Sequence, residues 1–167
     1  MRIIKLAIIS FIFLFLLITI ISLFIPSHVR ISKAININAE KDSLFAFIAD
    51  TGKWYLWHPA YQQTAAKTLQ NRITITPLIT NDSLVVMQLN LPGKKSLNSS
   101  WQVYHHRDTD SLTLQWYLDF NLKWYPWQKF SSLLYEERYG TMMQNGLTNL
   151  REITEHPPSH LINSYKR

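Results

Sequence analysis

The sequence predicts an α+β protein, in which an antiparallel sheet packs on a long C-terminal helix and one N-terminal helix spans a membrane. Three observations predict it. Residues 6–25 form an uncharged stretch in which all but three residues are apolar. Residues 111–122 carry apolar side chains at every second position, the period of a strand with one buried face. After residue 126 the apolar spacing changes to that of an α-helix.

The length and composition of the chain exclude or disfavour several classes of function. The 167 residues allow one ordinary domain beside the apolar stretch. The chain has no cysteine, which excludes disulfides, thiolate metal sites and cysteine nucleophiles. Its net charge of +6 is not gathered into basic runs with interleaved aromatics, so nucleic-acid binding is disfavoured. With only 4 glycines and no phosphate-binding motif, we expect no cofactor.

The apolar stretch from Leu6 to Ile25 contains no charge, and its 20 residues would span about 30 Å as a helix, the thickness of a bilayer core. A cleavable signal peptide is the competing interpretation. Its apolar core would be shorter and would end in a small-x-small cleavage site, whereas Pro26 and Ser27 follow here. We therefore expect an uncleaved single-pass anchor.

The orientation of this anchor rests on few charges. Arg2 and Lys5 precede it, and Arg30 and Lys33 follow closely, so the positive-inside rule is nearly balanced. A short basic head before the anchor and a folded domain behind it favour a cytoplasmic N-terminus in the cell membrane and an extracytoplasmic domain.

The first strand is expected from Val29 to Asn38, where alternate residues are apolar. Lys33 interrupts the apolar face, and a position near the rim would let its stem reach water. Asp42 or Ser43 can then cap a short helix. A second short helix, over residues 53–58, would place two tryptophans on one face before a proline ends it.

Four more strands are expected. The proline at position 77 indicates an edge strand or a bulge in the first of them. The four strands cover residues 72–79, 84–91, 100–107 and 111–122, with turns at Asn81-Asp82, Pro92-Gly93 and Asp108–Asp110.

The C-terminal helix is expected from Trp127 to Glu155. Its two halves do not share one apolar stripe, which predicts a kink or a change of contact surface near Gly140. The apolar positions are Trp127, Phe130, Leu133 and Leu134 in the first half, and Met142, Met143, Leu147, Leu150 and Ile153 in the second.

Two segments of the chain resemble the SRPBCC superfamily (START-like, polyketide cyclase/dehydrase type), specifically its small membrane-anchored bacterial members. These are IPSHVRISKAININAEKDSLFAFIADTGKWYLWHPA and YPWQKFSSLLYEERYGTMMQNGLTNLREI. The resemblance implies a helix-grip fold, in which a curved antiparallel sheet wraps the long helix around an apolar cavity. Between the short helices and the next strand only residues 60–71 remain, too few for the family's usual hairpin, so we expect about five strands.

These boundaries divide the chain into four parts. We expect a basic head over residues 1–5, an anchor over 6–25, a helix-grip domain over 28–156 and a polar tail over 157–167.

A cavity under the sheet would be lined by large rings and flexible methionines. The alternative is a plain filled core made of the same side chains. The candidate ligand-binding residues are Met87, Trp101, His105, Trp116, Phe120, Glu137, Met142 and Met143.

Acid–base chemistry has two candidates. Glu137 falls where the first apolar stripe of the helix would continue, although a solvated charged patch is the simpler interpretation. His105 shares the face of Trp101, while His106 points the other way, so the two cannot chelate one metal. No histidine spacing indicates a metal site.

Three hypotheses follow. The first is a non-catalytic, membrane-tethered binding domain for a hydrophobic small molecule, such as a lipid or an isoprenoid. The second is a cyclase- or hydratase-type enzyme that uses Glu137 or His105 as acid or base. The third is a non-catalytic module that docks a protein partner through its aromatic surface.

Overall fold

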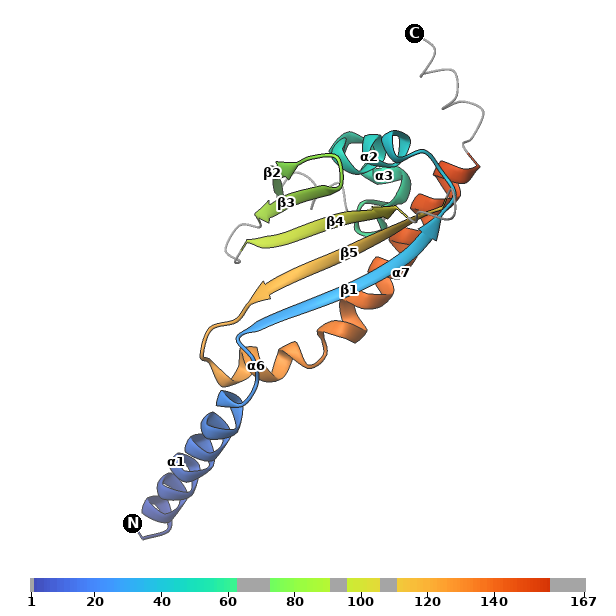
Figure 1. The fold of residues 1–167 in the computed structure, drawn as a ribbon. Coiled ribbons are helices and arrows are strands. Elements are labelled where there is room, and N and C mark those ends of the chain that lie inside the picture. The colour runs from blue at the N-terminus through green and yellow to red at the C-terminus, as the bar shows by residue number, and fades with distance from the viewer. Residues whose placement is uncertain (1, 63–72, 91–95, 106–110, 157–167) are drawn as a thin grey trace.

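The computed structural model describes residues 2–62, 73–90, 96–105 and 111–156. One long helix, α1 (Arg2–Leu23), projects from one end of an α+β domain (Figure 1). The domain consists of a five-stranded sheet, a group of short helices at the end far from α1, and a long C-terminal helix against the sheet. This is the predicted helix-grip arrangement.

All neighbouring strands of the sheet are antiparallel, in the order β1-β5-β4-β3-β2. The first and last strands therefore pair, which brings the N-terminal and C-terminal parts of the domain together. The strands are β1 (His28–Ile37), β2 (Thr74–Thr80), β3 (Leu84–Asn90), β4 (Leu97–His105) and β5 (Leu112–Asn121).

The alternation predicted from the sequence defines the buried face of the sheet. In β5, Leu112, Leu114, Trp116 and Leu118 are all buried, while the residues between them lie on the other face. Facing side chains pair across strands on the core side, for example Trp101 of β4 opposite Trp116. The prediction of a sheet with one apolar face is confirmed.

The edge strand β2 carries the irregularity expected from its proline. Its register against β3 shifts between Pro77 and Ile79, and the strand is largely exposed. The turn that follows is held by Asn81, whose Oδ1 accepts hydrogen bonds from the backbone N–H groups of Ser83 and Leu84.

The short helices differ in detail from the prediction. Helix α2 (Lys41–Ala49) begins before both expected capping residues, and its N-cap, Glu40, makes no side-chain cap. A 3₁₀ turn, η1 (Thr51–Lys53), leads into α3 (Trp54–Trp57). Pro59 was expected only to end the preceding helix. It also begins one further helical turn, α4 (Pro59–Gln62), because proline is favourable at the first position of a helix.

The predicted position of the kink or change of contact surface, near Gly140, was wrong. The helix breaks earlier, at residues 133–134, between α6 (Pro126–Ser132) and α7 (Tyr135–Glu155). Helix α6 contacts α1, whereas α7 crosses β1 and contacts α2, α3 and α4. The two apolar stripes belong to two helices with different neighbours, and Gly140 lies inside an unbroken helix.

The orientation of α6 also contradicts the sequence prediction. Its apolar stripe faces outward, while its buried residues are Pro126, Lys129 and Ser132. The exposed side chains are those of the predicted apolar stripe, namely Trp127 and Phe130 in α6 and Leu133 and Leu134 in the turn that follows it.

Three predicted features, the turn at Pro92-Gly93, the hairpin at Asp108–Asp110 and the tail over 157–167, lie outside the described residues.

Candidate functional site

Aromatic rings fill the space between the sheet, α7 and the short helices. Neighbouring rings lie 5.1–6.2 Å apart, mostly edge to face, the geometry that aromatic quadrupoles favour. The helices contribute Trp54, Trp57, His58 and Tyr61, and the sheet contributes Trp101 and Trp116; we call these six residues the aromatic cluster.

His58 lies at the centre of this cluster. Its ring stacks on Trp54 at 5.2 Å and meets Trp116 at the same distance, and only 4% of the residue is exposed. Its Nδ1 lies 3.3 Å from the backbone N–H of Ala60, which donates to it. Burial away from water lowers the pKa of His58 to about 4, so the ring is neutral at physiological pH.

Two polar atoms of the aromatic cluster have no hydrogen-bond partner among the described residues. They are the hydroxyl of Tyr61 and the Nε1 of Trp101. The neighbouring Trp116 is satisfied, because its Nε1 donates to Ser99 Oγ over 2.8 Å. Burial also raises the pKa of Tyr61 to about 12.

Helix α7 lies unusually close to this cluster at one glycine. A Cβ on Gly146 would lie 2.9 Å from Trp116 Cζ3 and 3.1 Å from Pro59 Cδ. Three residues later Asn149 donates from Nδ2 to the carbonyl of Trp57 over 3.0 Å. These contacts fix α7 against both the sheet and α3.

The predicted ligand-binding residues separate into three environments. Four of them are buried in the core: Met87, Trp101, Trp116 and Met143. Phe120 and Met142 are partly buried against that core. His105 and Glu137 are exposed, at the end of β4 and on the first turns of α7 respectively.

Glu137 borders a groove at the end of the domain that joins α1. The groove is open to solvent on one side, and its volume is about 580 Å³, within the size range of small-molecule sites. Phe120 supports it from behind, packing on Tyr135 at 4.7 Å and on Tyr139 at 5.0 Å between ring centroids. Its lining residues are Ser131, Leu134, Tyr135, Glu137, Arg138 and Tyr139, and we call it the α6–α7 groove.

His105 lines a different opening, of about 410 Å³, at the far end of the sheet. Asn38 and Leu112 border it, and these lie where β1 ends and β5 begins. The two acid–base candidates therefore lie at opposite ends of the domain and do not form one site.

An ion pair between β1 and α7 lies beside the α6–α7 groove. Lys33 Nζ contacts Glu136 Oε1 at 2.6 Å, and the two side chains are 32% and 61% exposed. The lysine that interrupts the first strand therefore crosses the sheet face to reach α7 at the rim. Gly140 leaves room for it, since a Cβ there would lie 3.0 Å from Lys33 Cε.

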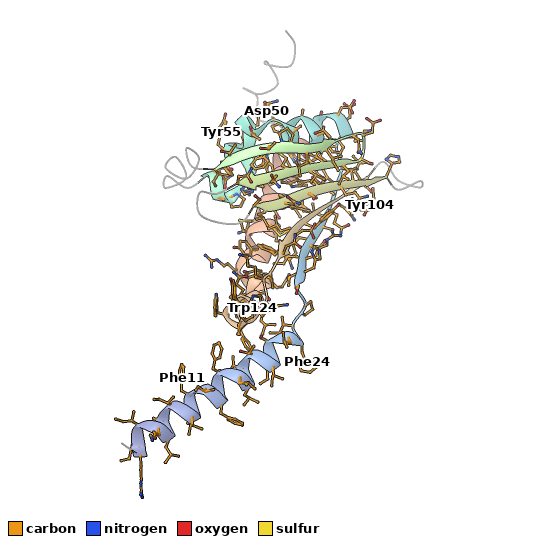
Figure 2. The ribbon with its side chains drawn as sticks, turned by 90° about the vertical axis from the view of Figure 1, so that its left-hand side faces the viewer. Phe11, Phe24, Asp50, Tyr55, Tyr104 and Trp124 are labelled. Atoms are coloured by element: carbon orange, nitrogen blue, oxygen red, sulfur yellow. The ribbon has the colours of Figure 1, made fainter. Side chains whose placement is uncertain are left out.

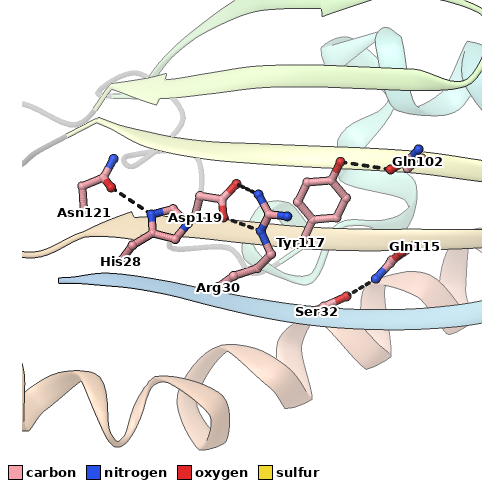
Figure 3. Close-up of polar contacts among 8 residues, drawn as sticks. All are labelled: His28, Arg30, Ser32, Gln102, Gln115, Tyr117, Asp119 and Asn121. Carbon is pink, nitrogen blue, oxygen red and sulfur yellow. Dashed lines mark hydrogen bonds and ion pairs between the residues drawn. The ribbon is translucent and has the colours of Figure 1, made fainter. Parts of the chain in front are cut away.

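The outward face of the sheet is polar, and its side chains pair across strands (Figure 3). Arg30 forms two hydrogen bonds with Asp119, at 2.7 and 3.0 Å, and lies over the ring of Tyr117. Tyr117 in turn donates to Gln102. Such pairs stabilise a solvated sheet surface. Among the described residues no group of His, Asp or Glu side chains is placed to hold a metal ion.

No family model and no curated protein sequence matches the chain. Solved structures do. A START superfamily protein from Mycobacterium smegmatis superposes with a TM-score of 0.54 at 12% identity, over 77% of this chain and 99% of its own. The chain has a START-like helix-grip fold.

Two further solved structures also superpose on the chain. The di-domain ARO/CYC StfQ of the steffimycin pathway has a TM-score of 0.55 at 9% identity, over 77% of this chain and 51% of its own. CalU16 from Micromonospora echinospora has a TM-score of 0.53 at 12% identity, over 78% of this chain and 68% of its own. At such identities the likeness establishes the START-like fold alone.

Sequence reasoning did not place His58 and Tyr61 at the centre of the START-like domain. The signal was present in the run Trp54–Tyr61, where the spacing of aromatic residues continues beyond Pro59. It was missed because Pro59 was expected to end helical structure.

Proposed function

We propose that this protein is a membrane-tethered, non-catalytic binding domain for a hydrophobic small molecule of lipid or isoprenoid type. The observation that carries the proposal is the α6–α7 groove at the anchored end of a START-like domain. Helix α1 has a mean hydropathy of 3.0 over a membrane-length window, so it would hold this groove next to lipid.

The chemistry of the α6–α7 groove suits an elongated molecule with one polar end. Leu134, Tyr135 and Tyr139 supply an apolar wall, and Arg138 with Glu137 supplies charge at the border. Ligand pockets commonly combine such an apolar lining with a few polar groups that fix orientation. A non-catalytic role fits the separation of Glu137 from His105 across the length of the domain.

Photolabelling of the groove tests the proposal. The full-length protein in phosphatidylcholine nanodiscs is irradiated with a diazirine-bearing farnesol, and specific labelling is the part competed by excess unlabelled farnesol. We expect specific labelling on the tryptic peptide over residues 130–138, which carries the groove residues of α6 and the start of α7. Mass spectrometry of the digest locates the label.

Two matched variants complete the experiment. Leu134→Glu places a carboxylate in the apolar wall at a side chain that is 62% exposed, so folding should survive while specific labelling falls several-fold. Leu78→Glu makes the same change on the exposed edge strand and should leave labelling unchanged. Labelling that is uncompeted, or equal in both variants, overturns the proposal.

A further inference from the structure

Helix α6 buries its polar side and exposes its apolar side. Lys129 and Ser132 are 3% and 6% exposed, whereas Trp127 and Leu133 are 62% and 65% exposed. A surface helix in water normally buries its apolar stripe and exposes its charges. The reverse arrangement indicates that the outer side of α6 meets an apolar medium or partner.

Lys129 fixes α6 to the end of α1. Its Nζ donates to the carbonyl of Ile25 over 2.6 Å and to Ser27 Oγ over 2.8 Å. Ile25 lies two residues beyond the last residue of α1, and the partial negative charge of a helix C-terminus favours a cation near that end. Ser22, in the last turn of α1, is fully buried, as expected where α1 and α6 are in contact.

This contact determines the position of α6 along the normal of a bilayer that α1 would span. The 22 residues of α1 would span about 33 Å, close to the thickness of the hydrocarbon core. Its C-terminal end therefore marks the boundary between acyl chains and head groups. Since one lysine side chain links α6 to that end, α6 lies at the same level.

The residues on the outer side of α6 and of the turn before it are those that favour this level. Trp124 is 61% exposed, and its ring lies tilted against Tyr125 at 4.9 Å between centroids, while Tyr125 stacks on Trp127 at 4.8 Å. Tryptophan and tyrosine are enriched at the membrane–water interface, where basic side chains also reach the head groups, as Lys123 would here. Figure 2 shows Trp124 at the end of the domain that joins α1, with Asp50 and Tyr55 at the opposite end.

We propose that α6 and the Trp124–Tyr125 turn form a membrane-contact surface, which lies in the interface of the leaflet where α1 ends. The outer side chains Trp124, Trp127, Phe130 and Leu133 insert at the head-group level, and Lys129 holds the helix there. The inference rests on the tether of the proposed function and adds a second contact with lipid. It also places the α6–α7 groove where a lipid could enter from the bilayer without crossing water.

Tryptophan quenching by brominated lipid tests this surface directly. Of the 6 tryptophans, four are fully buried in the domain, while Trp124 and Trp127 are exposed. In nanodiscs of acyl-brominated phosphatidylcholine, we expect the full-length protein to lose a substantial part of its fluorescence relative to unbrominated discs. The double variant Trp124→Phe/Trp127→Phe should lose most of this quenching and keep the emission of the buried tryptophans.

A site-specific probe separates lipid from protein partners. Because the chain has no cysteine, Leu133→Cys and Tyr55→Cys each accept one environment-sensitive NBD label. NBD at position 133 should shift to the blue and be quenched by brominated lipid, whereas NBD at position 55 should show neither effect.

The outcomes distinguish this inference from the proposed function. A shielded NBD at position 133 that bromine does not quench, with a signal that depends on protein copies per disc, means that a second copy covers α6 and overturns the inference. An unshifted NBD at position 133 in a protein that remains in the disc also overturns it. Failure of the farnesol labelling alone, with lipid quenching intact, overturns the ligand proposal and leaves the membrane contact standing.

Discussion

At the scale of single residues, the most unusual environment belongs to His58. A histidine that is 4% exposed and packed against tryptophan and tyrosine rings is stable only as the neutral imidazole, since no carboxylate among its described contacts compensates a charge. Its pKa of about 4 reflects the free-energy cost of a charged imidazole at this buried place. His58 therefore links the stability of the whole core to pH.

We expect stability to fall as the pH drops from 6.5 toward 4. The folded-state pKa of His58 lies below the ordinary value of 6.5, so the unfolded chain binds more protons in this window. The loss between pH 7 and pH 5 should be about 2 kcal/mol, measured by urea unfolding of the full-length protein in detergent. His58→Gln should remove most of this slope, and an unchanged slope in that variant would contradict the assignment.

At the scale of elements, the two C-terminal helices show how neighbours decide orientation. Helix α7 follows its amphipathic pattern, with Met143, Leu147 and Leu150 fully buried. Helix α6 reverses the pattern because Lys129 reaches the end of α1. Because the helix breaks between them, α7 packs in the core while α6 packs against the end of α1.

Two glycines of α7 give a matched test of its packing. Gly146→Ala should destabilise the domain by about 1–3 kcal/mol, because its methyl group would meet the rigid rings of Trp116 and Pro59. Gly140→Ala should be nearly neutral or slightly stabilising, since it meets only the ends of Lys33 and Glu136 and gains helix propensity. Thermal unfolding of the two variants measures both effects, and equal destabilisation would show that α7 does not pack as described.

At the scale of the whole molecule, helix α1 and the domain are in contact. Lys129 lies more than 100 positions after Ile25, yet its ammonium group binds the carbonyl of Ile25, two residues after the end of α1. A cleavable leader would not be expected to supply a hydrogen-bond partner to a buried side chain of the mature domain. This contact is a reason to expect that residues 6–25 are an uncleaved anchor, and that interpretation stays a prediction.

We expect the mature protein to keep its N-terminal segment and to stay in the membrane. Intact mass spectrometry of protein purified from membranes should give the full 19.7 kDa chain, and alkaline carbonate should not extract it. Labelling of Tyr55→Cys in intact cells with a membrane-impermeant maleimide should succeed if the domain is extracytoplasmic. Mass loss at the N-terminus would refute the anchor, and labelling only after lysis would reverse the orientation.

The sequence by itself determined the elements whose patterns are local. The alternation from Leu112 to Leu118, the proline bulge in β2 and the long apolar helix each depend on the period or length of one segment, so each could be predicted. With the resemblance at both ends of the domain, these patterns also predicted the helix-grip fold.

Only the tertiary structure decided which side of an element faces the protein. Trp127 and Leu133 fit a helical apolar pattern whether they face a core or a membrane, because the spacing of apolar residues carries no information about what packs against them. Likewise, Glu137 and His105 looked equivalent as pocket residues until the fold placed them at opposite ends. Contacts between distant segments, such as Lys129 with Ile25, set these orientations, and a local pattern does not encode them.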